Sequence, residues 1–220
     1  MEVEPTEWGA GRQQTGGQMW KTAAKACSFL LHPLLMPSIG ALILLYGPTY
    51  ISILPASYKF YILGIFALTT LFFPLFTLVL MKSLRIISGF SWESRQERIL
   101  PLLVVSAGYV VCYILLARYM SLGFFPQLLS GALVIAVACF GVNLFWKISL
   151  HMAAIGGIVG MLLYMSLRGY GAMVSILLAF ILLSGLLGAS RLYLGRHNVW
   201  QVLAGFACGV GVMVGILSFF

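Results

Sequence analysis

The polar stretch 190–201 holds residues whose types and spacing could do chemistry. Arg191, Arg196 and His197 lie here between two long apolar runs. A charged side chain beside hydrocarbon costs about 3 kcal/mol unless it faces water or a partner, so these residues are expected to line a site. An arginine offers a planar fork for phosphate oxygens, and a histidine can act as a nucleophile or carry a proton. His197 is expected near the start of a helix, where free N–H groups attract anions, and Gln201 follows one turn later. The stretch therefore predicts a site for phosphate.

Two earlier polar clusters contain residues that suit the same chemistry. Arg95 and Arg98 are three positions apart, so on a helix they project from one edge and could clamp phosphate oxygens. The alternative is a positively charged loop that contacts lipid headgroups. His151 follows Ser149 at the beginning of an apolar run, where it could protonate a leaving oxygen or serve only as an interfacial residue. His32 has no polar companions in the sequence and is interpreted as structural or interfacial.

The elements that must position these clusters are membrane-spanning helices. The chain of 220 residues is 61% hydrophobic and 8% charged, and several apolar runs are long enough to cross a bilayer. These runs are apolar on every face, whereas the strands of a transmembrane barrel alternate between apolar and polar residues. The sequence therefore predicts an all-α, polytopic transmembrane helical bundle of six to seven spans. The seven candidate spans lie at about 27–47, 60–81, 100–117, 126–146, 150–167, 172–188 and 198–219.

The N-terminal residues differ in composition from the rest of the chain. Residues 1–26 are polar and rich in Gly and Gln, so we expect a tail that ends in an interfacial anchor around Trp20 and Lys21. Residues 27–220 form the transmembrane domain. With seven spans, the three polar clusters all emerge on the membrane side that carries the N-terminus. We expect a multi-pass protein of a bacterial inner membrane.

The distribution of Lys and Arg leaves the membrane side of the clusters undecided. On this topology ten of the 13 basic residues lie on the side of the clusters, which favours a cytoplasmic location. Five of the ten belong to the clusters themselves and would be kept on either side. Without these, the cluster side has five basic residues and the opposite side has three, which are Lys59, Arg118 and Arg168. This difference is too small to assign the membrane side.

Composition also excludes several classes of function. The net charge of +8 comes from scattered cations and not from a continuous basic face, so membrane phosphates are expected partners and nucleic acids are not. All five acidic residues are glutamates, which argues against carboxylate-held Mg²⁺ or Ca²⁺ and against paired-carboxylate hydrolysis. The four cysteines lie in or beside apolar runs without Cys-x-x-Cys spacing, so they are expected in the core. We expect neither a metal nor another cofactor.

The three clusters together resemble the signatures of the type 2 phosphatidic acid phosphatase superfamily. Ser190-Arg191, five residues and His197 resemble its third signature, which continues with three residues and Asp, where this chain has Gln201. Ser149-Leu150-His151 resembles the second signature, Pro-Ser-Gly-His. The stretch 95–101 resembles a degenerate first signature, Lys, six residues, Arg-Pro. This chain has Ser91 for that lysine and Ile99 for that proline, and it lacks the Pro and Gly of the second signature.

The resemblance implies a metal-independent lipid phosphatase with a core like that of the superfamily. His197 would attack phosphorus to form a phosphohistidine, and His151 would protonate the leaving alcohol and later activate water. Gln201 would orient His197. The residues expected to bind the phosphate are Arg95, Arg98, Ser149, Ser190 and Arg191.

The implied substrate is a phosphorylated lipid, with the headgroup in the site and the chains left in the bilayer. Phosphatidate, phosphatidylglycerophosphate, prenyl diphosphates and lipid A fit this description. The departures from the signatures keep two alternatives open, a non-catalytic binder or transporter of lipid phosphates and a lipid-to-lipid phosphotransferase. The oligomeric state is not addressed by the sequence.

Overall fold

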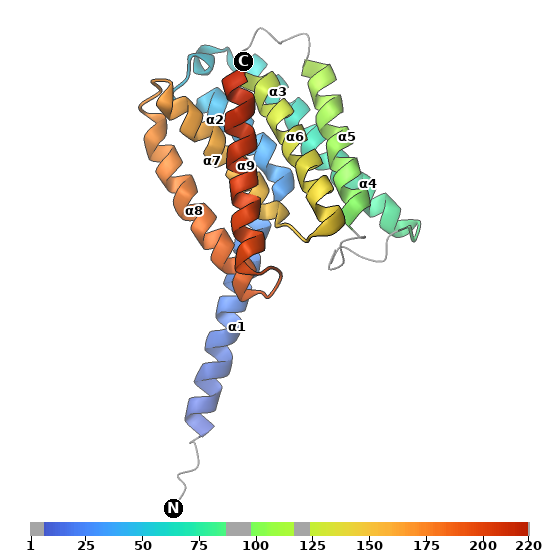
Figure 1. The fold of residues 1–220 in the computed structure, drawn as a ribbon, viewed down its shortest axis with the longest axis vertical. Coiled ribbons are helices and arrows are strands. Elements are labelled where there is room, and N and C mark those ends of the chain that lie inside the picture. The colour runs from blue at the N-terminus through green and yellow to red at the C-terminus, as the bar shows by residue number, and fades with distance from the viewer. Residues whose placement is uncertain (1–6, 87–97, 117–123, 220) are drawn as a thin grey trace, which may run out of the picture.

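The protein is an all-α membrane protein over the part of the chain that the structure describes. The computed structural model describes residues 7–86, 98–116 and 124–219, and side chains from residue 18 onward within these ranges. Figure 1 shows the helices as one bundle from which the N-terminal helix projects. The helices are α1 (Glu7–Leu30), η1 (Pro33–Leu35), α2 (Met36–Tyr46), η2 (Tyr50–Ile53), α3 (Ala56–Phe66), η3 (Ala67–Phe72), α4 (Phe73–Ser83), α5 (Ile99–Leu116), α6 (Phe124–Phe145), α7 (Leu150–Leu167), α8 (Met173–Tyr193) and α9 (Val199–Phe219).

Seven helical segments in the described ranges are long and apolar enough to cross a membrane. The predicted number of spans is therefore confirmed, and the chain is a multi-pass integral membrane protein. The segments are Gln18–Tyr46, Ala56–Ser83, Ile99–Leu116, Phe124–Phe145, Leu150–Leu167, Met173–Tyr193 and Val199–Phe219.

The largest differences from the predicted boundaries lie in the first and sixth spans. The first spanning segment begins at Gln18, because α1 continues without a break from Glu7 through the stretch that was interpreted as tail and anchor. The helix is interrupted around His32 by η1 and restarts as α2, and these elements lie within the same spanning segment. The sixth span continues five residues beyond the predicted 188, because the last turn of α8 carries the polar residues up to Tyr193.

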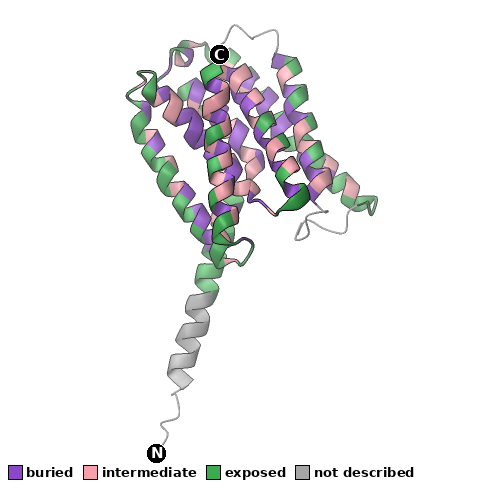
Figure 2. Cartoon of the chain, viewed as in Figure 1, coloured by how far each residue is buried: buried purple, intermediate pink, exposed green. Residues whose placement is uncertain are grey.

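Helix α7 is the central element of the bundle. Of its most apolar window, 61% is buried inside the protein, against 28–44% for the other six spans. It packs most extensively against α9 and also contacts α8 and α6. Figure 2 shows the buried residues concentrated on the inner helix faces, with exposed residues on the outside. Large apolar side chains such as Phe76 and Leu182 face outward, as expected where lipid surrounds the protein.

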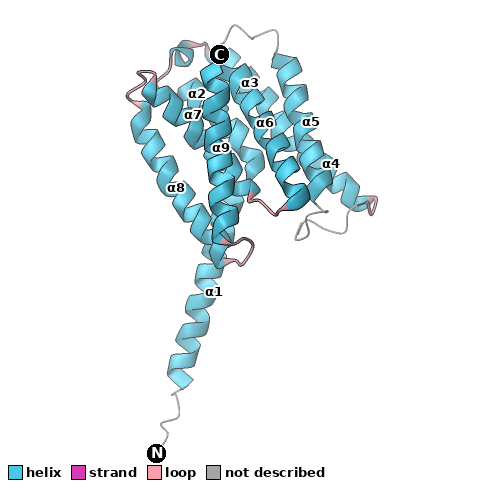
Figure 3. Ribbon diagram, in the orientation of Figure 1, coloured by secondary structure: helices cyan, strands magenta, loops and turns pink. Residues whose placement is uncertain are grey.

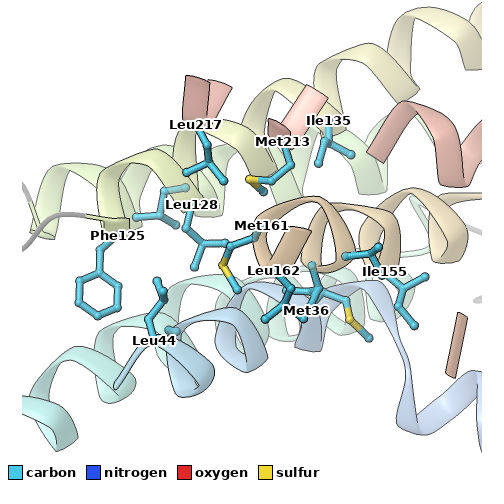
Figure 4. Packing of buried hydrophobic residues seen from close by; sticks show 14 of the residues in the cluster. Met36, Leu44, Phe125, Leu128, Ile135, Ile155, Met161, Leu162, Met213 and Leu217 are labelled. Carbon is cyan, nitrogen blue, oxygen red and sulfur yellow. The ribbon is translucent and has the colours of Figure 1, made fainter. Parts of the chain in front are cut away.

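Glycines allow α7 and α9 to approach closely. A Cβ at Gly156 would lie 2.5 Å from the backbone oxygen of Phe206, and one at Gly205 would lie 2.5 Å from that of Ser149. Both distances are too short for any side chain, so the backbones of the two helices touch. Side chains from α2, α6, α7 and α9 fill the adjoining core, including Leu44, Leu128 and Leu162 (Figure 4).

The second span contains a π-helical turn near its middle. Pro74 cannot donate a backbone hydrogen bond, and η3 (Ala67–Phe72) comes directly before it. Thr69 donates its hydroxyl to the Ile65 carbonyl at 2.7 Å, and Thr70 donates to Phe66 at 2.8 Å. Both threonines are buried, so these bonds satisfy their hydroxyls inside the bundle.

The polar connections meet at one end of the bundle. Figure 3 shows the loops between α6 and α7 and between α8 and α9 at the end toward which the N-terminus projects, and α5 begins at this end too. The loops that follow α2 and α7 lie at the opposite end. The common sidedness that the sequence predicted is therefore confirmed for the described clusters.

Candidate functional site

The end of α8 turns the chain sharply toward the next helix. Gly195 has a φ of 64°, a left-handed conformation that glycine adopts without strain. Its N–H donates to the Leu192 carbonyl at 2.9 Å, and the N–H of Arg196 donates to the Arg191 carbonyl at 3.2 Å. This pair of bonds is a Schellman motif, which satisfies the last carbonyls of the helix. The turn leaves Arg191 on the last turn of α8 and brings Arg196 into the loop.

The start of α9 fixes His197 just before the helix. Asn198 caps α9, because its Oδ1 accepts the N–H of Gln201 at 2.9 Å, while the N–H of Asn198 donates to Oε1 of Gln201 at 3.4 Å. The same Oε1 lies 3.0 Å from Nδ1 of His197. Since an amide oxygen only accepts hydrogen bonds, Nδ1 carries the proton and Nε2 keeps its lone pair. His197 is thus held with a free nucleophilic nitrogen.

His197 is a neutral imidazole at physiological pH. Burial lowers its pKa to about 4; the hydrogen bond that its Nδ1–H donates to Gln201 opposes this shift, and the nearby charges of Arg98, Arg191 and Lys147 add to it. Only 8% of the residue is exposed. A neutral ring is the form that can attack an electrophile.

The start of α7 is tied to the start of α9. The N–H of Ser149 donates to the backbone oxygen of Gln201 at 3.2 Å, and Gly205 contacts the Ser149 carbonyl. The Ser149 hydroxyl is fully buried and has no hydrogen-bond partner in the described structure. These contacts place His151, on the first turn of α7, beside the His197 loop.

His151 is held by the N-terminal helix. Its Nε2 lies 3.2 Å from the backbone oxygen of Ser28 on α1. A carbonyl only accepts, so Nε2 carries a proton and Nδ1 retains the lone pair in the neutral ring. The tautomer is therefore opposite to that of His197.

His32 belongs to the same site, which the sequence interpretation missed. Its ring centroid lies 5.4 Å from that of His151, at an interplanar angle of 82°. Membrane parity could have found it, because residue 32 precedes most of the first apolar run and so lies at the end that carries the N-terminus. The sequence offered no polar neighbour to draw attention to it.

One cavity of about 770 Å³ joins these groups. All three histidines of the chain line it, together with four cations and no carboxylate among the described lining residues. The cations are Arg98, Lys147, Arg191 and Arg196. Arg196 was expected to line a site and Lys147 was counted among the cations of the clusters, and both line this cavity.

Two arginines of the cavity are positioned differently. Arg98 is buried and donates from Nη1 to the Ile148 carbonyl at 3.1 Å, so it joins the start of α5 to the loop before α7. Burial lowers the pKa of Arg98. The Nε of Arg191 is buried and has no hydrogen-bond partner in the described part of the chain. A buried donor without a partner is expensive unless a ligand accepts from it, so an anion is the occupant that this position suits.

The other predicted site residues lie beside the cavity or outside the described ranges. The Ser190 hydroxyl donates to the Leu186 carbonyl of its own helix at 2.8 Å and does not line the cavity. Ser149 and Gln201 do not line the cavity. Gln201 accepts a hydrogen bond from the lining residue His197, and the Ser149 N–H donates to the Gln201 carbonyl. Arg95 lies outside the described residues.

The cavity continues from its polar end into the apolar interior. Most of its remaining lining is aliphatic or aromatic and comes from several spans, including Leu78, Val105, Leu128, Ile135, Ile158 and Met213. A ligand with an anionic head and an apolar body matches this division.

The imidazoles do not form a metal centre. Within the described ranges, no group of three His, Cys, Asp or Glu side chains could hold a metal ion. The site instead combines a neutral imidazole with a free Nε2, a second imidazole with a free Nδ1 and several guanidinium groups. Such a set can bind a phosphoryl group, accept it on nitrogen and move a proton. Comparisons with protein-family models, curated proteins and solved structures find no match to this chain.

Proposed function

We propose that the protein is a lipid phosphatase that hydrolyses a phosphomonoester or diphosphate on a membrane lipid through a phosphohistidine at His197. The observation that carries the proposal is the single cavity that joins Arg98, His151, Arg191 and His197, which come from three separate connections in the sequence. Its apolar continuation suits a lipid better than a soluble phosphate.

The free nitrogens of the two imidazoles suit a two-step reaction. Nε2 of His197 attacks phosphorus, and the bond from phosphorus to the leaving oxygen breaks. Before this step the free Nδ1 of His151 takes up a proton from bulk water as the anionic substrate binds, and it gives this proton to the leaving oxygen. In the second step His151 takes a proton from water at the same nitrogen, and the resulting hydroxide attacks the phosphohistidine. Phosphate leaves, and Nε2 of His197 regains its lone pair.

The cations of the cavity would stabilise the charge of the transferring group. Arg191 can donate from its buried Nε, and Arg98 is fixed through the Ile148 carbonyl. Preorganised donors of this kind act strongly in a site from which water is excluded. The resemblance of stretches 95–101, 149–151 and 190–197 to the signatures of the type 2 phosphatidic acid phosphatases supports the same assignment. It also predicts the order of these groups along the chain.

Phosphate release from defined lipids tests the proposal. Purified protein in detergent would be incubated with phosphatidate, phosphatidylglycerophosphate, a prenyl diphosphate and lipid A, and free phosphate would be measured. We expect release from at least one lipid and loss of at least about a thousandfold in His197→Ala. Arg191→Ala is expected to be impaired too. Its matched control is Arg168→Ala, because Arg168 lies at the opposite end, over the Tyr164 ring.

The same assay separates the alternatives. Release from none of the lipids, or equal release by folded His197→Ala protein, would contradict the proposal and favour a binder or transporter. Label transferred from a lipid donor to another lipid, with none in water, would identify a phosphotransferase. Acid-labile label on the protein, absent in His197→Ala, would support the phosphohistidine.

A further inference from the structure

The N-terminal segment supplies a third imidazole to the cavity, at a position that none of the three signatures covers. We propose that His32 is a further phosphate-binding residue, whose Nε2–H donates a hydrogen bond to an oxygen of the anion held beside His151. This inference rests on the proposed function for its catalytic consequences, whereas its binding step can be measured independently.

The tautomer of His32 follows from its place in the backbone. His32 caps η1 with an extended backbone, and its Nδ1 accepts the N–H of Leu34 at 3.3 Å. A backbone N–H can only donate, so Nδ1 holds a lone pair and the single proton of the ring sits on Nε2. The ring therefore presents a donor, and only a donor, at the atom farthest from the backbone.

The N-terminal segment gives His32 and His151 complementary roles. The Ser28 carbonyl of α1 holds the proton of His151 on Nε2, and the Leu34 N–H holds that of His32 on the same atom. The two rings are in edge-to-face contact, and both line the cavity. His151 keeps a free lone pair for proton transfer, but His32 has used its own on the cap. His32 is therefore suited to binding and not to acid–base work.

The surroundings of His32 favour an anion as its acceptor. The cavity contains four cations, and no carboxylate is among its described lining residues. Within the described structure, the hydrogen bond of His32 is the one made by Nδ1, which leaves Nε2 without a protein acceptor. A phosphoryl oxygen drawn in by the cations would meet this donor next to His151. Hydrogen bonds to a charged acceptor are the stronger kind.

Two substitutions separate the cap from the donor. The side-chain oxygen of Asn lies about where Nδ1 of a histidine lies, so His32→Asn keeps the cap and loses the donor. The amide nitrogen of Gln reaches about as far as Nε2, so His32→Gln keeps the donor and loses the cap. A purely structural role predicts that the Asn variant behaves as wild type and that the Gln variant is impaired. The proposal predicts the reverse for phosphate binding.

Nitrogen-15 NMR of histidine-labelled protein in detergent gives the direct readout, with inorganic phosphate as the probe. Only three histidines contribute signals, and all line the cavity. We expect the Nε2–H tautomer for His32 and a shift of this resonance on addition of phosphate. In His32→Asn we expect the phosphate Kd to rise at least about tenfold while the melting temperature stays unchanged. In His32→Gln we expect the phosphate Kd to stay within about threefold of the wild-type value.

Turnover supplies the second readout. If the wild type hydrolyses a lipid phosphate, the KM should rise in His32→Asn more than kcat falls, because the lost donor binds substrate and transition state alike. A phosphate Kd in the Asn variant equal to that of wild type would overturn the proposal, as would an Nδ1–H tautomer at His32. Absence of turnover in wild-type protein that binds phosphate with the expected NMR shift would instead refute the phosphatase and leave the His32 site standing.

Discussion

Gln201 accepts a hydrogen bond from Nδ1 of His197 at 3.0 Å, at the position where the signature it resembles has a carboxylate. The amide fixes the same tautomer that a carboxylate would. It provides no negative charge, however, to balance the positive charge that would develop on the ring in the proposed attack of Nε2 on phosphorus. At the scale of single residues, the orientation of the proposed nucleophile is therefore retained and its electrostatic support is reduced.

Gln201→Glu restores this charge without a change of length. The carboxylate would raise the pKa of His197 from about 4, because an opposite charge favours the imidazolium. Since the neutral ring is the reactive form, the acid limb of kcat/KM should move from near pH 4 to higher pH. At pH 7 we expect kcat to rise by at least about tenfold, because the developing imidazolium is stabilised.

A pH profile of lipid hydrolysis checks this expectation. Gln18→Glu is the matched control, because it adds the same charge at an exposed position on α1 and should leave both the limb and kcat unchanged. An unchanged limb together with a lower kcat in Gln201→Glu would show that the carboxylate does not act on His197.

The candidate site could be predicted from sequence only where polar residues cluster. Arg191 and His197 are neighbours in the chain, and their spacing resembles a signature. His32 reaches the cavity because helices from distant parts of the chain meet there. No local pattern contains that information. The partner that holds His151 is likewise a backbone carbonyl of α1, and a backbone group has no sequence signal at all.

At the scale of elements, the position of the His197 loop depends on contact between α7 and α9. Gly205 lies on the second turn of α9 and contacts the Ser149 carbonyl just before α7. The next link is the bond from the Ser149 N–H to the Gln201 carbonyl. Through these two contacts, the start of α7 sets the distance between His151 and His197.

Gly205→Ala should separate the two helix starts. The added Cβ would lie 2.5 Å from a backbone oxygen, which cannot rotate away, so the helices must move apart. We expect a loss of about 1–3 kcal/mol in stability, seen as a lower melting temperature in detergent. We also expect at least about a tenfold loss of kcat, because small displacements of reacting groups are costly.

Gly211→Ala is the matched control on the same helix. A Cβ there meets nothing within 4 Å, so stability and activity should stay at or above the wild-type level. Equal behaviour of the two variants would mean that the α7–α9 contact does not position the site.

The number of spans could be predicted because it depends on the length of apolar runs, which the sequence displays directly. Helix α1 was harder to predict, because its residues 7–26 are largely polar and its position depends on contacts with distant parts of the chain. It packs against α8 and holds His151 through Ser28. The π-helical turn η3 could not be predicted either, because Pro74 indicates that the α-helix is interrupted but not which conformation replaces it.

At the scale of the whole molecule, the cavity divides into a polar end and an apolar interior. The sequence predicted that lipid chains stay in the bilayer while the headgroup enters the site. The lining offers a second arrangement, because apolar side chains from α4, α5, α6, α7 and α9 continue the cavity beyond the imidazoles. A chain inside the bundle would add apolar contact to the binding of the headgroup.

Ala132→Phe distinguishes the two arrangements. Ala132 lines the cavity from α6, so a phenyl ring there would occupy space that a chain needs. With the chain inside, kcat/KM should fall at least about tenfold for long-chain lipid phosphates and stay within about twofold for short-chain ones. With the chain in the bilayer, the variant should treat both lengths alike. Ala138→Phe lies on the same helix outside the cavity lining and controls for the bulk of the ring. A chain-length effect shared by both variants would place its cause in the packing of α6 and not in the cavity.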